Sequence, residues 1–241
     1  MTPASPLFHF KQFSVAQQSA AMKVNTDGVL LGAWADAANA RRILDVGTGV
    51  GVIALMLAQR NAAARIDAVE IDERSAQLAR ENVQNSPWSD RITVYGQSFQ
   101  SFAAQGGARY DLVVSNPPYF VNALLPPSEA RTLARHAGEL PHEELLSGAK
   151  KILQSGGALC VVLPLSEGTA FIERAAAHRL FCLRQTTVYS KAGKPPKRLL
   201  LHFSDASASA AKDTLVIHQD GGGYTPKYKT IIMPFLMNNE Q

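Results

Sequence analysis

One short stretch of the sequence combines residue types that suit transfer of a group to an amine nitrogen. It reads N-P-P-Y, from Asn116 to Tyr119, and only Ser115 separates it from the apolar run at 112–114. Prolines have no N–H to donate to a strand ladder, so the chain leaves the predicted strand in a rigid turn. The side-chain carbonyl of Asn116 and the backbone carbonyl of Pro117 can both accept N–H bonds from an exocyclic amine. These bonds draw the nitrogen toward a tetrahedral geometry and aim its lone pair at an electrophilic carbon, so positioning and electrostatics supply most of the effect.

The predicted catalytic residues are Asn116, Pro117, Pro118 and Tyr119. Tyr119 offers an aromatic face for a target base, and such stacking is worth about 1–3 kcal/mol. The alternative is purely structural, an unusual proline turn that carries a buried aromatic residue.

A second stretch predicts the cofactor. It reads D-V-G-T-G-V-G, from Asp45 to Gly51, and its glycines permit a tight turn in which backbone N–H groups approach a ligand. Dinucleotide sites prefer G-x-G-x-x-G, whereas this turn has G-x-G-x-G with an acid before it. Asp45 would repel a pyrophosphate and suits an ammonium group, which S-adenosylmethionine carries on its methionine end. Both features disfavour a dehydrogenase.

Acidic residues at the end of the next predicted strand fit the same ligand. Glu70 stands 19 residues after Gly51, where a carboxylate can accept hydrogen bonds from ribose hydroxyls. Asp72 either joins it or only caps the next helix.

The third predicted strand end is less typical. Ser98 stands where a carboxylate often contacts the adenine amino group, so only a weaker hydroxyl hydrogen bond is available. Phe99 either stacks on the adenine or belongs to the core. The cofactor-binding set predicted from these stretches is Asp45, Gly47, Gly49, Gly51, Glu70, Ile71, Ser98, Phe99 and Asn116.

The remaining sequence supplies the elements that must position these turns. Apolar strand-like runs are predicted at 42–46, 66–70, 92–95, 110–115, 158–163, 180–189 and 198–203, and helices at 52–59, 75–84, 145–153 and 170–178. The alternation predicts an α/β protein with a Rossmann-like, seven-stranded, mostly parallel sheet. The last two strands have a short connection and predict an antiparallel hairpin at one end. Ligands of such sheets bind at the carboxyl ends of the strands, so the two turns should share one edge.

We expect one domain over 1–241, with an N-terminal cap at 1–40, a catalytic core at 41–205 and a C-terminal extension at 206–241. The composition, 46% hydrophobic and 18% charged, is typical of a globular protein. Two cysteines, no signal-peptide pattern and no apolar run near about 18 residues predict a cytoplasmic protein without a membrane span. No metal site is predicted.

Basic residues are concentrated late in the chain. Residues 174–204 hold seven Lys and Arg and no acid, which indicates either a solvated surface or a polyanion partner. The predicted RNA-binding residues are Lys191, Lys194, Lys197 and Arg198 in the late hairpin, with Arg131 and Arg135 in the long loop at 121–141.

The pair D-V-G-T-G-V-G and N-P-P-Y, 65 residues apart, resembles the class I S-adenosylmethionine-dependent amino-methyltransferases. Members with this pattern methylate adenine N6, cytosine N4, guanine N2 or a glutamine amide. The stretches at 10–13, 21–34, 81–88 and 160–164 further resemble the bacterial tRNA1(Val) (adenine(37)-N6)-methyltransferase family over roughly residues 8–205.

This resemblance implies the class I methyltransferase fold and methylation of N6 on the adenosine just 3′ of the anticodon in a valine tRNA, with S-adenosylhomocysteine as product. It also implies that Lys23, Thr26 and Asp27 lie over the cofactor pocket, although a solvated Lys23 and a helix cap at Thr26–Gly28 are the structural alternatives. Ser98 departs from the family's Asp, and the last 35 residues look divergent.

The motifs indicate the reaction more strongly than the acceptor. The same chemistry on another amine is the main alternative: a ribosomal guanine N2, a DNA adenine N6 or a protein glutamine. A non-catalytic S-adenosylmethionine- or tRNA-binding module is a further one, which the intact Asn116 and glycine turn disfavour.

Overall fold

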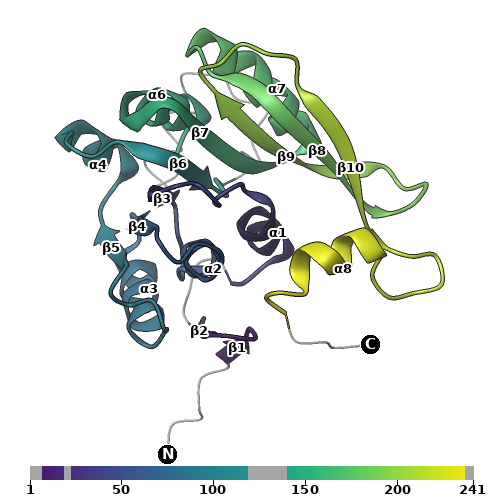
Figure 1. Ribbon diagram of the computed structural model, residues 1–241, viewed down its shortest axis with the longest axis horizontal. Coiled ribbons are helices and arrows are strands. Elements are labelled where there is room, and N and C mark those ends of the chain that lie inside the picture. The colour runs from purple at the N-terminus through teal and green to yellow at the C-terminus, as the bar shows by residue number, and fades with distance from the viewer. Residues whose placement is uncertain (1–6, 19–22, 119–139, 237–241) are drawn as a thin grey trace, which may run out of the picture.

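The computed structural model describes residues 7–18, 23–118 and 140–236, which form an α/β fold around one large sheet (Figure 1). The sheet has eight strands in the order β10-β8-β9-β7-β6-β3-β4-β5. In that order the strands are β10 (Ala211–His218), β8 (Phe181–Lys191), β9 (Pro196–Ser204), β7 (Leu153–Pro164), β6 (Tyr110–Ser115), β3 (Arg42–Val46), β4 (Arg65–Glu70) and β5 (Ile92–Gly96). Only β9 runs antiparallel to its neighbours, β7 and β8.

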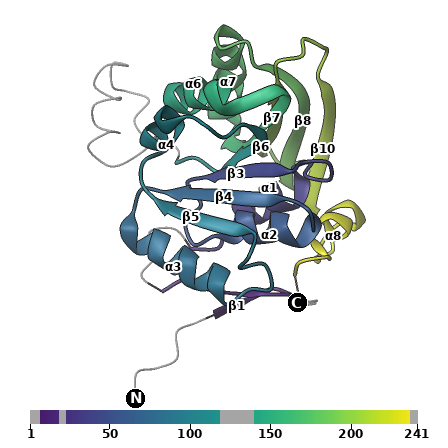
Figure 2. The same cartoon turned by 60° about the vertical axis from the view of Figure 1, so that its left-hand side comes forward.

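Helices cover both faces of the sheet, as Figure 2 shows. The helices are α1 (Thr26–Trp34), α2 (Val52–Arg60), α3 (Glu73–Gln84), α4 (Phe99–Gln105), α6 (His142–Ile152), α7 (Leu165–Ala177) and α8 (Pro226–Ile232). One hydrophobic core joins α1, α2 and α8 to the sheet, and a second joins α4, α6 and α7 to the opposite face. Both cores are continuous with the strands that carry the two sequence motifs.

The N-terminal residues form a two-stranded hairpin, β1 (Leu7–His9) and β2 (Ser14–Ala16), outside the large sheet. Asn82 of α3 holds it, since its side chain accepts from the Ala16 amide and donates to the Ala16 carbonyl at 2.8 and 3.0 Å. Phe10 also bridges to Leu236, so the two ends of the described chain meet.

The predicted mostly parallel sheet and its antiparallel hairpin are confirmed, but the predicted number of seven strands is wrong. The eighth strand, β10, lies in the segment predicted as a C-terminal extension and pairs in parallel with β8. It follows a low-complexity loop and, at an edge of the sheet, fully buries only Leu215, so its sequence lacks a strong apolar alternation.

Two helices, α4 and α8, are not predicted from sequence, and α1 is considered only through the alternative of a helix cap at Thr26–Gly28. The helix α4 has only seven residues, too few for a helical period to emerge. In α1 the sequence V-L-L-G-A-W is apolar on nearly every side, because the helix is buried between α2 and the sheet. The helix α8 has only seven residues and begins at Pro226, which occupies its first turn.

Candidate functional site

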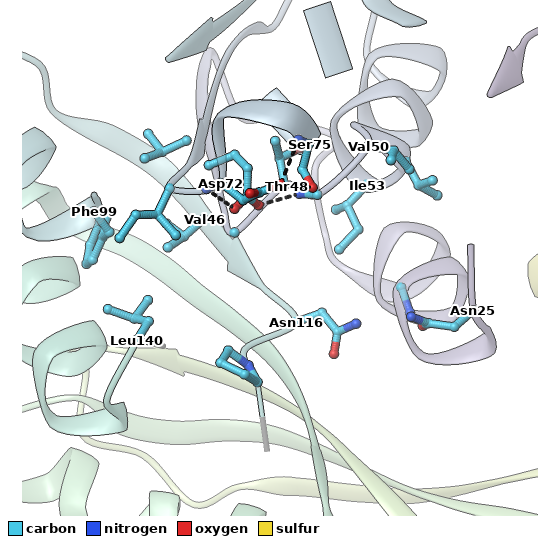
Figure 3. A pocket seen from close by; sticks show the side chains of 18 of the residues that line it. Asn25, Val46, Thr48, Val50, Ile53, Asp72, Ser75, Phe99, Asn116 and Leu140 are labelled. Carbon is cyan, nitrogen blue, oxygen red and sulfur yellow. Dashed lines mark hydrogen bonds between the residues drawn. The ribbon is translucent and has the colours of Figure 1, made fainter. Parts of the chain in front are cut away.

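A cavity of about 540 Å³ opens at the carboxyl ends of β3, β4 and β6. Figure 3 shows Phe99 and Leu140 toward one end of it and Asn25 and Asn116 toward the other. Its lining residues are Lys23, Val24, Asn25, Gly28, Val46, Gly47, Thr48, Gly49, Val50, Val52, Ile53, Val69, Glu70, Ile71, Asp72, Ser75, Gln97, Phe99, Gln100, Asn116, Pro118 and Leu140. The structure therefore brings residues from both sequence motifs to one pocket.

The glycine turn after β3 needs its glycines for backbone conformation. Gly47, Gly49 and Gly51 have φ values of +69°, +57° and +89°, a region that side chains disfavour. A Cβ added at Gly47 or Gly49 would meet nothing within 4 Å, so space beside the turn is open to a ligand. Gly47 and Gly49 line the pocket, whereas Gly51 packs against Ala79.

Asp45 lies beneath this turn. It is fully buried, and its Oδ2 accepts from Thr48 Oγ1 at 2.6 Å and from the Ala54 amide at 3.1 Å. Its Oδ1 has no hydrogen-bond partner among the described residues. Burial raises the pKa of Asp45 to about 7, against the lowering effect of the two hydrogen bonds. Asp45 does not line the pocket, so its visible role is to tie the turn to the start of α2.

Glu70 both lines the pocket and supports the turn. Its Oε2 accepts from the Gly49 amide at 2.9 Å, and its Oε1 accepts from the Asp72 amide at 2.9 Å. Asp72 caps α3 through the Ser75 amide at 2.8 Å, and the hydrogen bonds from Ser75 lower the pKa of Asp72. Asp72 also lines the pocket, so the predicted cap is observed and a contact with a ligand stays a prediction.

Asn116 follows β6 and faces the start of α1 across the pocket (Figure 3). A Cβ added at Gly28 of α1 would lie 3.9 Å from Asn116 Nδ2, so these two residues are close neighbours. Pro118 lines the pocket, and Pro117 is buried without lining it. Tyr119 lies outside the described residues.

The predicted residues before and within α1 divide into two groups. Lys23 lines the pocket, whereas Thr26 and Asp27 do not. The helix cap is Asn25, whose Oδ1 accepts from the Gly28 amide at 2.9 Å. Asn25 also lines the pocket and was missed from sequence, although an Asn three residues before Gly28 at a helix start is a recognisable cap signal.

At the other end of the pocket, Ser98 and Phe99 have different roles. Ser98 caps α4, because its Oγ accepts from the Ser101 amide at 3.2 Å, and it does not line the pocket. Phe99 lines the pocket and is only 4% exposed, so it also belongs to the core. Ile71, which is 52% exposed, lines the pocket as well, together with Gln97 and Gln100, which sequence reasoning missed.

The predicted RNA-binding residues differ in exposure and in their partners. The turn between β8 and β9 lies between Lys191 and Lys197. Arg198, near the start of β9, pairs with Pro164, the last residue of β7, so this turn lies beside the carboxyl end of β7. Lys194 and Lys197 are exposed there, and Lys191 is half-buried. Arg198 instead forms an ion pair with Asp27, with 2.7 Å between Nε and Oδ2. Arg131 and Arg135 lie outside the described residues.

Across residues 7–18, 23–118 and 140–236 no helix has the length and apolarity to cross a membrane. The same residues contain no group of three or more His, Cys, Asp or Glu side chains that could hold a metal ion.

The strand order, the glycine turn after β3 and the N-P-P turn after β6 define a class I methyltransferase fold. An Agrobacterium tumefaciens protein described as a predicted O-methyltransferase has the same fold, with a TM-score of 0.69, 22% identity, and coverage of 87% of this chain and 96% of that one. The precorrin-6y C5,15-methyltransferase of Geobacter metallireducens matches at a TM-score of 0.54 and 14% identity, covering 81% of this chain and 95% of that one. Residues 22–176 match the methyltransferase small domain family.

The chain belongs to the tRNA1(Val) (adenine(37)-N6)-methyltransferase family. The family member of Trichodesmium erythraeum is 47% identical over 232 residues, which cover 95% of this chain and 97% of that protein. The member of Bacteroides thetaiotaomicron is 43% identical over 98% of this chain and 99% of its own length. These matches extend well beyond the 8–205 region in which the resemblance is visible by motif.

Proposed function

We propose that this protein transfers a methyl group from S-adenosylmethionine to N6 of adenine 37 in a valine tRNA. The observation that carries the proposal is the position of Asn116 in the same pocket as the glycine turn, in a chain whose relatives bear that activity in their names. A cytoplasmic location belongs to the proposal, because tRNA is modified there.

The pocket fits the cofactor by the chemistry of its lining. Glu70 and Asp72 offer carboxylates for ribose hydroxyls, and the open backbone at Gly47 and Gly49 lets a ligand approach closely. Val69, Ile71 and Phe99 form an apolar wall suited to a flat base. Lys23 supplies a positive charge for a carboxylate. When bound, S-adenosylmethionine supplies an electrophilic sulfonium methyl group.

Asn116 and Pro117 orient the acceptor. Their carbonyl oxygens accept the two N–H groups of the adenine amine, which makes the nitrogen lone pair available for attack. Ser115, one residue earlier, donates from Oγ to the Val46 carbonyl at 2.9 Å, and this bond fixes the end of β6 against the end of β3. The two motifs are thereby held at a constant separation, which is what catalysis by positioning requires.

Two exposed lysines at the β8–β9 connection, Lys194 in the turn and Lys197 in β9, suit the phosphates of a tRNA. Lys194 and Lys197 lie at the carboxyl edge of the sheet, as the pocket does. Contacts of this kind release counterions, so tRNA affinity should fall steeply as salt increases. The adenosine next to the anticodon lies in a loop, where a base can be extruded without opening a duplex.

An acceptor assay tests the proposal. The protein is incubated with labelled S-adenosylmethionine and, separately, with total tRNA, total rRNA, DNA and a protein extract. We expect label in tRNA, as N6-methyladenosine beside the anticodon of a valine isoacceptor. Label in any other fraction and none in tRNA would refute the proposed acceptor, and no label anywhere would refute the reaction.

Gly148 of α6 lies against the ring of Phe99, and the absence of a side chain at Gly148 leaves room for that ring. A Cβ at Gly148 would overlap the Phe99 ring and lie 2.8 Å from its Cζ. The Gly148→Ala substitution should therefore displace the ring into the pocket and weaken cofactor binding by about tenfold, since overpacking costs roughly 1–3 kcal/mol. Calorimetric titration with S-adenosylhomocysteine measures the change.

Gly96→Ala is the matched control for Gly148→Ala. The added Cβ would overlap Glu73 Oε2 and lie 2.6 Å from Arg80 Nη2. These are the ends of two long side chains that form an ion pair near the surface and can move away. Cofactor affinity should stay within about twofold of the wild type, because an exposed ion pair contributes little. Equal losses in the two variants would show that the Phe99 contact is not what sets the affinity.

A further inference from the structure

The start of α1 forms one wall of the pocket. Lys23, Val24, Asn25 and Gly28 line it, all within four residues of Asp27. Gly28 is also close to Asn116, since a Cβ added at Gly28 would lie 3.9 Å from Asn116 Nδ2. Any shift of this first turn therefore changes the space opposite the N-P-P turn.

Asp27 holds this turn from outside the pocket. Arg198 Nε donates to Asp27 Oδ2 at 2.7 Å, and Arg198 Nη1 donates to the Lys197 carbonyl at 2.9 Å. The two side chains are only 16% and 30% exposed, so the pair is partly shielded from solvent. Asp27 also lies in the first turn of a helix, where a negative charge is favourable. The pair connects the wall of the pocket to β9.

The opposite end of α1 is held by different contacts. Arg60 Nη1 donates to the Gly32 and Ala35 carbonyls at 2.9 and 2.5 Å, and Trp34 Nε1 donates to Thr186 Oγ1 at 2.9 Å. These contacts lie away from the pocket lining. Loss of the Asp27–Arg198 pair would therefore remove one link at the pocket end of α1, where the Val24 amide also donates to Gln17 Oε1 at 2.9 Å, while the far end would keep its contacts.

We propose that the Asp27–Arg198 ion pair is a positioning pair, which keeps the start of α1 in the arrangement that binds the cofactor. Arg198 is accordingly not a phosphate contact, although its sequence neighbourhood predicts one. The exposed Lys194 of the adjoining turn and the exposed Lys197 of β9 take that role, while Arg198 supports the pocket. This inference rests on the proposed use of S-adenosylmethionine and tRNA.

Calorimetric titration with S-adenosylhomocysteine, on the full chain and without tRNA, tests the pair. Asp27→Asn and Arg198→Gln should each weaken binding by about fivefold, because the binding arrangement becomes less populated. The double variant should bind S-adenosylhomocysteine no more weakly than the weaker-binding single variant, since each single substitution already removes the same interaction. Arg198→Lys, which keeps the charge, should recover part of the affinity. Unchanged affinity in the folded single variants, or fully additive losses, would overturn the proposal.

Thr186→Val separates positioning from general stability. It removes the hydroxyl that accepts from Trp34 at the far end of α1, so it should lower the melting temperature and leave cofactor affinity unchanged. The Asp27 and Arg198 variants should instead raise KM for the cofactor more than they lower kcat. If Thr186→Val and Asp27→Asn affect cofactor affinity equally, the pair has no specific positioning role.

The salt dependence of tRNA binding tests the reassignment of Arg198. Lys197→Gln should reduce the slope of log K against log salt by about one, whereas Arg198→Gln should leave that slope unchanged. A slope reduced equally in both variants would restore Arg198 as a phosphate contact. Failure of the wild type to bind tRNA would refute the proposed acceptor instead, and the cofactor titration would still decide the role of the pair.

Discussion

Replacing Asn116 with alanine should lower methyl transfer by about 10²–10³-fold or more, because preorganised hydrogen-bond partners of the reacting group are worth that much in comparable sites. The variant would lose the side-chain carbonyl that we propose orients the acceptor amine, and the backbone carbonyl of Pro117 would not replace it. Single-turnover methylation of tRNA at saturating S-adenosylmethionine measures the effect. Near wild-type turnover would refute the assignment of Asn116.

Cofactor affinity must be measured on the same Asn116→Ala variant, because Asn116 also lines the pocket. We expect a change of no more than a few fold, since the carboxylates and the glycine turn lie on other strands. Asn116→Asp is the matched variant: it retains an oxygen acceptor at nearly the same size, so it should keep more activity than the alanine variant. A loss of cofactor binding as large as the loss of rate would show that Asn116 acts mainly on the cofactor.

The positions of the two motifs follow from the sequence because parallel-sheet geometry is simple. Strands of a βαβ sheet point the same way, so the residues after β3 and β6 must share one edge. The sequence alone therefore predicts that Asp45, the glycine turn, Glu70 and Asn116 lie near one another. Their local sequences also set their conformations, through glycines with positive φ and prolines without N–H groups.

Three residues have contacts in the structure that their sequence context does not indicate. Arg198 lies among lysines in the sequence, but its ion-pair partner Asp27 is 171 residues away. Ser98 is expected from sequence to reach the cofactor, whereas the structure uses its hydroxyl to cap α4, a helix too short to be predicted. Gly148 has no distinguishing sequence context, and its purpose appears only when α6 is seen against Phe99. Periodicity and motif spacing carry no information about such contacts.

The buried carboxyl of Asp45 should make the cofactor-free protein less stable as pH rises from about 4 to 8. In the unfolded chain this group has a pKa of 3.8, and burial in the folded chain raises it to about 7. Between these values the folded state retains a proton that the unfolded state has lost, so the free energy of unfolding falls with increasing pH. The loss is complete above the folded pKa and amounts to roughly 4 kcal/mol.

Urea unfolding of wild type and Asp45→Asn between pH 4 and pH 8 measures this contribution. The amide side chain of the variant would still accept from Thr48 and Ala54 but would not ionise, so the decline with pH should be smaller by most of that amount. The absolute stability of Asp45→Asn also includes the cost of burying the side-chain NH2 group where Asp45 has Oδ1, an atom without a hydrogen-bond partner among the described residues. That cost does not vary with pH, so the slope and not the midpoint reports on Asp45.

Asp205→Asn is the control of opposite sign. The amide of Gly156 lowers the pKa of Asp205, so its contribution is present at neutral pH and is lost only as pH falls. Removing it should change the acid side of the profile and leave the decline from pH 5 to pH 8 intact. An Asp45→Asn profile parallel to the wild type over that window would show that the carboxyl is not the group that titrates.

Saturating S-adenosylhomocysteine distinguishes the two roles considered for Asp45. Because Asp45 lies beneath the glycine turn and does not line the pocket, we expect the ligand to raise stability at every pH and to leave the decline in place. A direct contact with the ligand's ammonium group would instead favour the ionised carboxyl and flatten the profile. Persistence of the slope therefore assigns Asp45 to the support of the turn, and its disappearance restores the ammonium contact that the sequence predicts.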